Sequence, residues 1–316
     1  MKLRRRALPL LALALVARAQ GFPMRPVRLI VPFPAGGPTD VVGRLLAERL
    51  AQRWGQPVIV DNRPGAGTVV GTQALVLAPP DGHTLCVAIS ALTVNAALRS
   101  DLPFDTRRDV APVTRLANTH IALVTPVRTG MTTLADALAR ARTTDGGLAY
   151  ASPGIGTVTH MAGELLALLG GVTLVHVPYP GSGPALNDVL GGRVPLMFDV
   201  WHSVKPHVLA GTLRVLGTGS RQPVPGFAEL PRIPDSFPDF EAASVFGLVA
   251  PGATPLALRQ SIAVDVAASL AEPAVAARLD DLGMMPAAAG PEEYRAFIDA
   301  DIIRWAGLLA AAAGPR

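Results

Sequence analysis

The stretch FPAGGPTD, residues 33–40, joins two segments of different character. The apolar run before it, at 27–31, predicts a strand buried on both faces. After it, hydrophobic residues recur at helical spacing through 41–54. An apolar strand, a glycine-rich turn and a helix therefore follow one another. The same construction recurs at three further turns: NRPGAGT (62–68), SPGIGT (152–157) and YPGSGP (179–184).

Helix starts of this kind are suited to anions. The first backbone N–H groups of a helix have no intrahelical acceptor, and the macrodipole places partial positive charge there. Turns of this type gather at the carboxyl ends of strands in open α/β sheets, so four of them predict a cleft for a small anion. Ordinary strand-to-helix turns favour the same residues, with Thr39, Thr68 and Thr157 as helix caps, and this alternative stays open.

Short apolar runs alternate with helical stretches along the rest of the chain, a pattern typical of an α/β fold. Further strands are expected at 58–60, 85–89, 120–124, 148–150, 172–177, 194–198, 213–216 and 245–250. Further helices are expected at 68–78, 134–142, 158–169, 184–190 and, with breaks near 283–291, from 255 to 312. Proline-rich residues 222–240 are expected to form a surface connection. One consistent arrangement is two similar halves, with the C-terminal segment returning to the first.

Composition excludes several classes of protein. Half of the 316 residues are hydrophobic and 16% are charged, so the chain can bury a sizeable core. The single cysteine, Cys86, excludes an internal disulfide, and no Cys/His cluster has zinc-site spacing, so we expect no metal site. The first 19 residues hold five basic side chains and no acid. Without them the formal charge of +4 becomes −1, which gives no support for nucleic-acid binding.

The N-terminus has the anatomy of a secretion signal. Basic residues at 2–6 lead into the apolar run 7–17, and Ala17-Arg18-Ala19 forms a small-x-small cleavage pattern. The apolar run is shorter than the roughly 20 residues that a membrane-spanning helix needs. We therefore expect residues 1–19 to be a signal peptide, cleaved near Ala19, and the mature protein to be soluble and exported. An uncleaved N-terminal anchor is the alternative.

Recognisable catalytic motifs are absent from the sequence. It has no G-x-S-x-G elbow, no Walker lysine and no H-E-x-x-H pair, so no catalytic residue is expected. A loose glycine pattern at 65–71 leaves a dinucleotide enzyme as a minor alternative.

Three polar side chains near the turns have alternative roles. His160 follows the turn at 152–157, and either contacts a ligand carboxylate or serves in packing or capping. Asp199 closes the strand at 194–198, and either faces the cleft, caps the next helix or pairs with an arginine. Asp40 either caps its helix or meets a cation of the ligand, such as an amino group.

Several ordered motifs together resemble the substrate-binding proteins of tripartite tricarboxylate transporters, also called the Bug family. The resemblance extends from about residue 24 to residue 312. It rests on VPFPAGGPTD (31–40), DNRPGAG (61–67), APPDGHTL (78–85), YAS with the following glycine turn and MAGEL (150–165), HVPY with Gly181, LGG (190–192) and MFD (197–199).

The resemblance implies a type II periplasmic binding-protein fold of the α/β class, with two lobes around a ligand cleft. On this basis, residues 20–124 with 246–316 form the first lobe and residues 125–245 the second. Carried over by position, the ligand contacts of the first lobe are Phe33, Gly37, Thr39 and Asp40. Those of the second lobe are Ser152, Gly156, Thr157, His160, Tyr179, Gly181 and Asp199.

The resemblance also implies a function. The expected protein is a monomeric receptor that captures a small carboxylate, such as a di- or tricarboxylate, an acidic amino acid or an aromatic acid. It would deliver this ligand to the membrane permease of a tripartite transporter, with no cofactor and no chemistry. Two alternatives stay open: a secreted α/β enzyme acting on a small anionic substrate, and a ligand-responsive adaptor for a membrane sensor.

Overall fold

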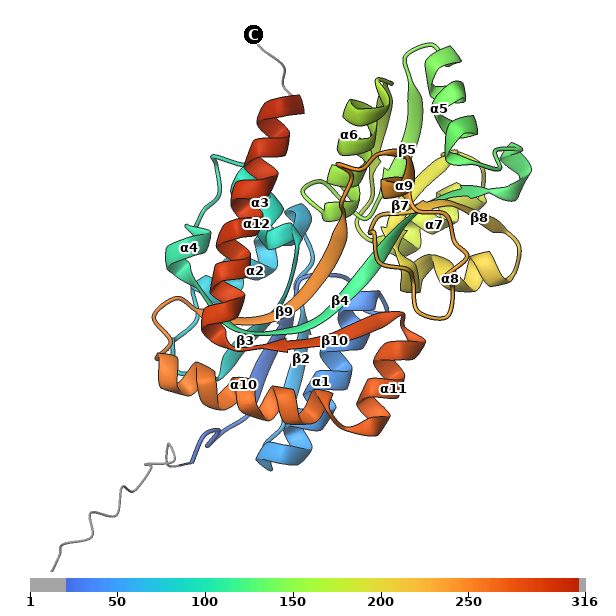
Figure 1. Cartoon of the computed structure of the whole chain (residues 1–316). Coiled ribbons are helices and arrows are strands. Elements are labelled where there is room, and N and C mark those ends of the chain that lie inside the picture. The colour runs from blue at the N-terminus through green and yellow to red at the C-terminus, as the bar shows by residue number, and fades with distance from the viewer. Residues whose placement is uncertain (1–20, 313–316) are drawn as a thin grey trace, which may run out of the picture.

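Ten strands form one continuous hydrogen-bonded network in the computed structural model, which describes residues 21–312 (Figure 1). The predicted signal peptide therefore lies outside the described residues. The strands are β1 (Val27–Val31), β2 (Val58–Asn62), β3 (Thr84–Ile89), β4 (Val110–Pro126), β5 (Leu148–Ser152), β6 (Leu174–Pro178), β7 (Leu196–Val200), β8 (Leu213–Thr218), β9 (Ala243–Pro251) and β10 (Met284–Ala289). Their order is β2-β1-β3-β9-β4-β7-β5-β6, and β8 and β10 also pair with β4.

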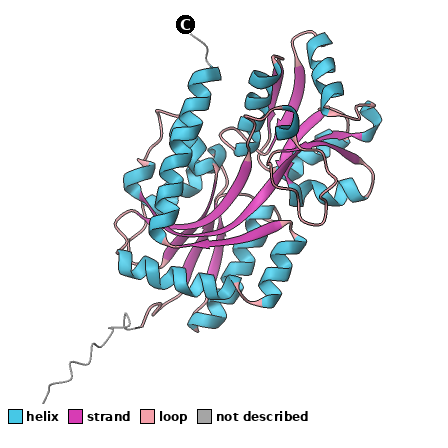
Figure 2. Ribbon diagram, viewed as in Figure 1, coloured by secondary structure: helices cyan, strands magenta, loops and turns pink. Residues whose placement is uncertain are grey.

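Helices lie beside the strands throughout, which confirms the predicted α/β class (Figure 2). They are α1 (Pro38–Trp54), α2 (Val69–Val76), α3 (Ala91–Leu98), α4 (Thr106–Asp109), α5 (Leu134–Thr143), α6 (Val158–Gly170), α7 (Ser182–Leu190), α8 (Trp201–Leu209), α9 (Ile233–Ser236), α10 (Leu256–Leu270), α11 (Pro273–Asp281) and α12 (Pro291–Ala312). Short 3₁₀ turns occur at η1 (Ala66–Thr68) and η2 (Val127–Thr129).

The long strand β4 joins the two lobes. Its first part pairs with β9 and β10, and its last part pairs with β7 and β8. In Figure 1 it runs from one group of strands into the other. The predicted lobe limits, 124/125 and 245/246, both fall inside strands, β4 and β9. The division into these two lobes remains a prediction.

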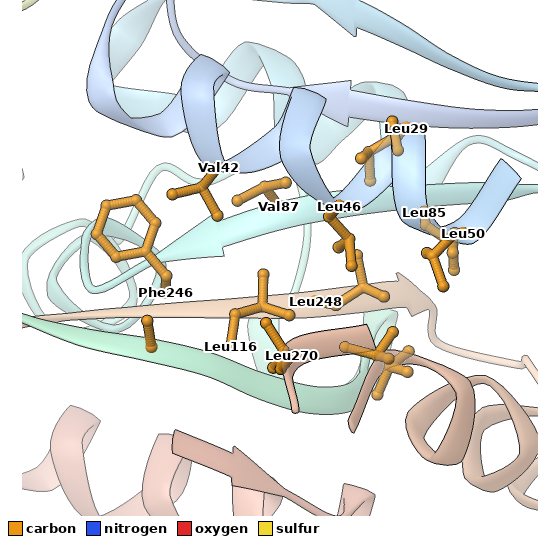
Figure 3. Packing of buried hydrophobic residues seen from close by; sticks show 14 of the residues in the cluster. Leu29, Val42, Leu46, Leu50, Leu85, Val87, Leu116, Phe246, Leu248 and Leu270 are labelled. Carbon is orange, nitrogen blue, oxygen red and sulfur yellow. The ribbon is translucent and has the colours of Figure 1, made fainter. Parts of the chain in front are cut away.

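The core of the first lobe lies between α1 and the sheet (Figure 3). Val42, Leu46 and Leu50 are spaced four residues apart on α1 and are almost fully buried. They pack against Leu29 of β1 and Leu248 of β9, among others. Burial of side chains of this size contributes about 1.5 to 3 kcal/mol each.

Close packing at Gly43 fixes the start of α1 above the end of β1. A methyl group on Gly43 would lie only 2.6 Å from Cγ2 of Val31, so only glycine allows this approach. Strands β2 and β3 are parallel to β1, so their carboxyl ends lie at the same edge of the sheet. In the second lobe β5, β6 and β7 are parallel in the same way.

Helix α12 contacts both lobes. Tyr294, Ile298 and Ile302 pack in a cluster of the first lobe, whereas Trp305 packs with Phe198 in the core of the second. In Figure 1 this helix stands beside α3, against which it packs. The side chains of α12 thus pack first beside the strands β1, β3 and β9 and then against the core that contains Phe198.

Residues 222–240 were expected to form a surface connection, and this expectation is wrong for part of the segment. Ile233 and Phe240 are fully buried in the core of the second lobe, and α9 forms between them. Val224 is also buried, in a second cluster of this lobe, so apolar side chains along the proline-rich stretch attach it to the core.

The lone thiol of Cys86 lies inside β3 and is 2% exposed. Burial raises the pKa of this thiol, which keeps it protonated and unreactive at neutral pH. Among the described residues, no helix has the length and apolar character needed to cross a bilayer.

Candidate functional site

A cavity of about 380 Å³ lies where the carboxyl ends of the strands of both lobes meet. The N-termini of three helices, α1, α6 and α7, form most of its wall, and the ends of β7 and β9 complete it. Its lining residues are Phe33 to Thr39, Ile89, Pro153, Thr157 to Thr159, Pro180 to Pro184, Asp199, Val200, Ser244 and Phe246.

The first of these helix starts is held in place by Asp40. Its Oδ2 accepts hydrogen bonds from the Gly36 N–H (2.9 Å) and Arg44 Nε (2.8 Å). Its Oδ1 accepts one from Asn62 Nδ2 (2.9 Å), which also donates to the Phe33 carbonyl. Burial alone would raise the pKa of Asp40, but these hydrogen bonds outweigh burial and hold the pKa below its usual value. Asp40 therefore shapes the 33–37 loop from behind and does not line the cavity.

The second helix start, that of α6, is capped by Thr157. The Thr157 hydroxyl accepts a hydrogen bond from the His160 N–H (3.2 Å) and donates to the Gly154 carbonyl (2.7 Å). The Gly156 N–H in turn donates to Nδ1 of His160 (3.3 Å). Of the two roles weighed for His160, the structure therefore favours packing and capping, because the ring holds the turn and lies outside the cavity lining.

Two histidines stack behind this turn. The rings of His160 and His176 lie 4.1 Å apart, and Nε2 of His176 is 2.7 Å from Oγ of Ser152. Burial lowers the pKa of both histidines; for His176 the neighbouring His160 adds to the effect and the pKa falls to about 4. Both rings are therefore neutral at physiological pH, and Ser152 is buried beneath the turn rather than facing the cavity.

We expect His176 to make folding stability depend on pH. Below pH 6.5 the unfolded chain takes up a proton on this ring, whereas the folded protein does so only near pH 4. The stabilisation is therefore present above pH 6.5 and is lost as the pH falls toward 4. The control is His176→Gln, whose amide replaces Nε2 but does not titrate. Relative to this variant, the wild-type free energy of unfolding should rise by about 1 to 2 kcal/mol as the pH increases from 4 to 6.5. Urea unfolding at several pH values measures this difference. If the free energy of unfolding changes with pH in the same way for both proteins, His176 does not have this role.

The third helix start, that of α7, meets the end of β7. Oγ of Ser182 donates to Oδ1 of Asp199 (3.0 Å), and Gly181 adopts a φ of +128° that favours glycine. A methyl group on Gly181 would approach Pro34 of the first lobe at 3.7 Å, so the two lobes are close here. Asp199 is fully buried, and it lines the cavity.

The fourth predicted turn lies elsewhere. Residues 64–68 line a neighbouring hollow of about 390 Å³, together with Ile155 and Tyr179. Ala66 and Thr68 have positive φ values, and a methyl group on Gly67 would lie 2.1 Å from the Ile155 carbonyl oxygen of the other lobe. Three of the four turns thus line the first cavity, and the hollow lined by the fourth turn adjoins it, because Phe33, Pro34, Pro153 and Pro180 line both. Tyr179 lies in this second hollow, where its hydroxyl donates to Asp188 (2.8 Å).

Of the eleven predicted ligand contacts, six line the cavity: Phe33, Gly37, Thr39, Thr157, Gly181 and Asp199. The other five lie outside its lining: Asp40, Ser152, Gly156, His160 and Tyr179. The lining also contains residues that were not named from the sequence: Ile89, Val158, Thr159, Ser182, Val200, Ser244 and Phe246. Thr159 and Ser182 lie within two positions of predicted contacts, so the turn pattern could have indicated them. Ser244 and Phe246 reach the cavity only because β9 pairs with β3 and β4.

The positive partial charges around the cavity come from the backbone. Among residues 21–312, Asp199 is the only titratable side chain that lines the cavity, and none of these lining residues is an arginine, a lysine or a histidine. The first-turn N–H groups of Thr39 on α1, Val158 and Thr159 on α6, and Ser182 and Gly183 on α7 have no acceptor within their own helices. Within residues 21–312, no group of three or more His, Cys, Asp or Glu side chains is arranged to hold a metal ion.

Two α/β lobes that enclose a cavity between them define the type II periplasmic binding-protein class. Residues 42–313 match the model of the tripartite tricarboxylate transporter family receptor, so the chain belongs to this family. BugT of Bordetella pertussis is 34% identical over 294 residues, which cover 92% of this chain and 90% of BugT.

Two solved structures of related proteins have the same fold. A protein from R. palustris solved with adipate has a TM-score of 0.86 and 31% identity, covering 92% of this chain and 98% of its own. MatC from Rhodopseudomonas palustris, with bound malate, has a TM-score of 0.84 and 29% identity, covering 91% of this chain and 99% of MatC.

Proposed function

We propose that the protein is a periplasmic receptor that binds a small carboxylate and presents it to the membrane permease of a tripartite transporter. The observation that carries the proposal is the convergence of three helix N-termini on one cavity without a basic side chain. Such a site replaces the hydration of an anion with fixed N–H dipoles. It has no paired nucleophile and base, so the role is capture rather than catalysis.

The family and its solved members support a carboxylate as the ligand class. The relatives solved with adipate and with malate hold dicarboxylates, and they share the fold of this chain over more than nine-tenths of its length. A cavity of about 380 Å³ has the size of a small-molecule site. The partner permease, the monomeric state and export through a cleaved signal peptide belong to the same proposal.

A thermal-shift screen tests the ligand class. Dicarboxylates, tricarboxylates, acidic amino acids and aromatic acids are compared with uncharged amide analogues such as succinamide and benzamide. At a concentration of a hundred times Kd, a ligand that binds only the folded state stabilises it by about 2.7 kcal/mol, which raises the midpoint by roughly 5 to 10 °C. A midpoint raised by an amide and by no carboxylate would refute the proposal.

A proline variant tests the role of the helix N-termini. Val158 is the first residue of α6, and Thr157 before it has an extended backbone that accepts a following proline. Val158→Pro removes one N–H from the cavity wall, and we expect affinity to fall about tenfold. Leu256→Pro removes the corresponding N–H at the first position of α10, away from the cavity, and is the control for that loss, although Leu256 is exposed and Val158 is buried. Equal affinities for the two variants would contradict the role of the backbone N–H groups.

A further inference from the structure

Asp199 has one carboxylate oxygen that the protein leaves without a partner. Oδ1 accepts hydrogen bonds from Oγ of Ser182 (3.0 Å) and from the Val200 N–H (2.7 Å). Among the described residues, Oδ2 is buried with no hydrogen-bond partner. The residue as a whole is fully buried, and it lines the cavity between the lobes.

A buried carboxylate oxygen without a hydrogen-bond partner lowers the stability of the folded protein. Ile89, Val200 and Phe246 are among the apolar residues of the same lining, and none of the described residues that line the cavity is basic. Burial raises the pKa of Asp199 to about 7, although the hydrogen bonds from Ser182 and Val200 act in the opposite direction. Buried polar atoms in proteins generally find a partner, and Asp199 lines the cavity, so a hydrogen-bond donor on a bound molecule would satisfy Oδ2.

We propose that Asp199 determines specificity by accepting a hydrogen bond from the ligand, so the preferred ligand is a carboxylate that also carries an N–H or O–H group. This inference rests on the proposed function, because it assumes that a carboxylate occupies the cavity. The carboxylate of the ligand faces the helix N-termini, and its amino or hydroxyl group faces Oδ2. A second, bare carboxylate at that position would meet Asp199 oxygen to oxygen, and would bind only together with a proton.

The variant Asp199→Asn separates this role from a structural one. Ser182 and Val200 both donate hydrogen bonds to the Oδ1 position, which therefore requires an acceptor. The amide oxygen of the asparagine occupies that position. Its NH₂ group then replaces Oδ2 and donates into the cavity. The variant therefore exchanges an acceptor for a donor at one atom and leaves both internal hydrogen bonds in place.

The experiment measures Kd for four ligand pairs at about pH 8, where Asp199 is mostly ionised. The pairs are succinate and aspartate, glutarate and glutamate, adipate and 2-aminoadipate, and benzoate and 4-hydroxybenzoate. We expect the wild-type protein to bind the donor-bearing member of its best pair about tenfold more tightly, and Asp199→Asn to prefer the plain member. Asp145→Asn, an exposed aspartate of the same lobe, is the control and should match the wild type.

The outcomes separate the two proposals. If the wild type binds carboxylates and Asp199→Asn keeps the same order within each pair, the specificity role of Asp199 is wrong and the proposed function stands. If no member of any pair binds the wild type, the proposed function fails and the inference fails with it. Asp199→Ala, which offers neither donor nor acceptor, should lose the preference without reversing it. It provides the same test if Asp199→Asn does not fold.

Discussion

Gly67→Ala is expected to weaken ligand binding about tenfold or more, while the protein stays folded. A methyl group on Gly67 would lie 2.1 Å from the carbonyl oxygen of Ile155, which belongs to the opposite lobe. The Gly67 carbonyl is held by Nδ2 of Asn95 (2.7 Å), so the loop does not retreat easily. The added methyl group therefore forces the two lobes apart and opens the cavity that both lobes form.

A matched variant isolates the contact between the lobes. Gly67 and Gly55 have similar backbone conformations, with φ of +60° and +65°, but a methyl group on Gly55 meets nothing within 4 Å. Both substitutions bear the cost of a left-handed alanine, about 1 to 2 kcal/mol. Only Gly67→Ala should weaken binding, as measured by titration calorimetry with a ligand from the thermal-shift screen. Equal Kd values for the two variants would mean that this contact plays no part in binding.

Asp40→Asn is expected to lower the free energy of unfolding by about 2 to 4 kcal/mol, and the melting midpoint by roughly 5 to 15 °C. The buried carboxylate accepts three hydrogen bonds, from Gly36, Arg44 and Asn62. An asparagine supplies a single acceptor oxygen, so its NH₂ group faces at least one of these donors. The 33–37 loop, part of the cavity wall, loses its support.

The same variant tests which role Asp40 has. If its carboxylate met an amino group of the ligand, Asp40→Asn would weaken amino acids more than dicarboxylates. In the structure its oxygens are used within the lobe, so we expect both ligand classes to lose affinity to a similar extent. Asp101→Asn removes an exposed partner of Arg99 and should leave the midpoint and the affinity nearly unchanged. A loss confined to amino acids would restore the ligand-binding role.

Much of the fold could be predicted because its strands and helices are locally consistent. The strand-turn-helix units around 27–54 and 148–170 have apolar runs, glycine turns and helical periodicity in the right order. The first part of β4 was missed because Pro112, Arg115 and Asn118 interrupt its apolar pattern. Register shifts at 112/114 and 115/117 accommodate this part of the strand, and no local pattern indicates them.

Two other missed elements depend on tertiary contacts. Strand β10 has the sequence MMPAAA and pairs only with β4, a position that tolerates its proline. Helix α3 was missed because ALTVNAAL has no polar face, being packed against α12.

The glycine-rich turns indicated where the cavity lies, but not which of their residues line it, because Ser152, Gly156 and Tyr179 belong to these turns and lie outside the lining. Phe33, Gly37 and Thr157 follow from the glycine-rich turns, and they line the cavity. His160 lies in the right segment, but its ring turns back to accept a hydrogen bond from the Gly156 N–H. Sequence alone places a residue on an element, and packing then decides which of its neighbours it faces.

The buried state of Cys86 makes this chain convenient to label. Since it is the sole native thiol and is shielded inside β3, a cysteine introduced elsewhere becomes the single reactive attachment point for a dye. Ile155, 54% exposed beside the contact between the lobes, is well placed for such a substitution. A fluorophore there would report occupancy as a change in emission, and the receptor would become an optical sensor for its own solute.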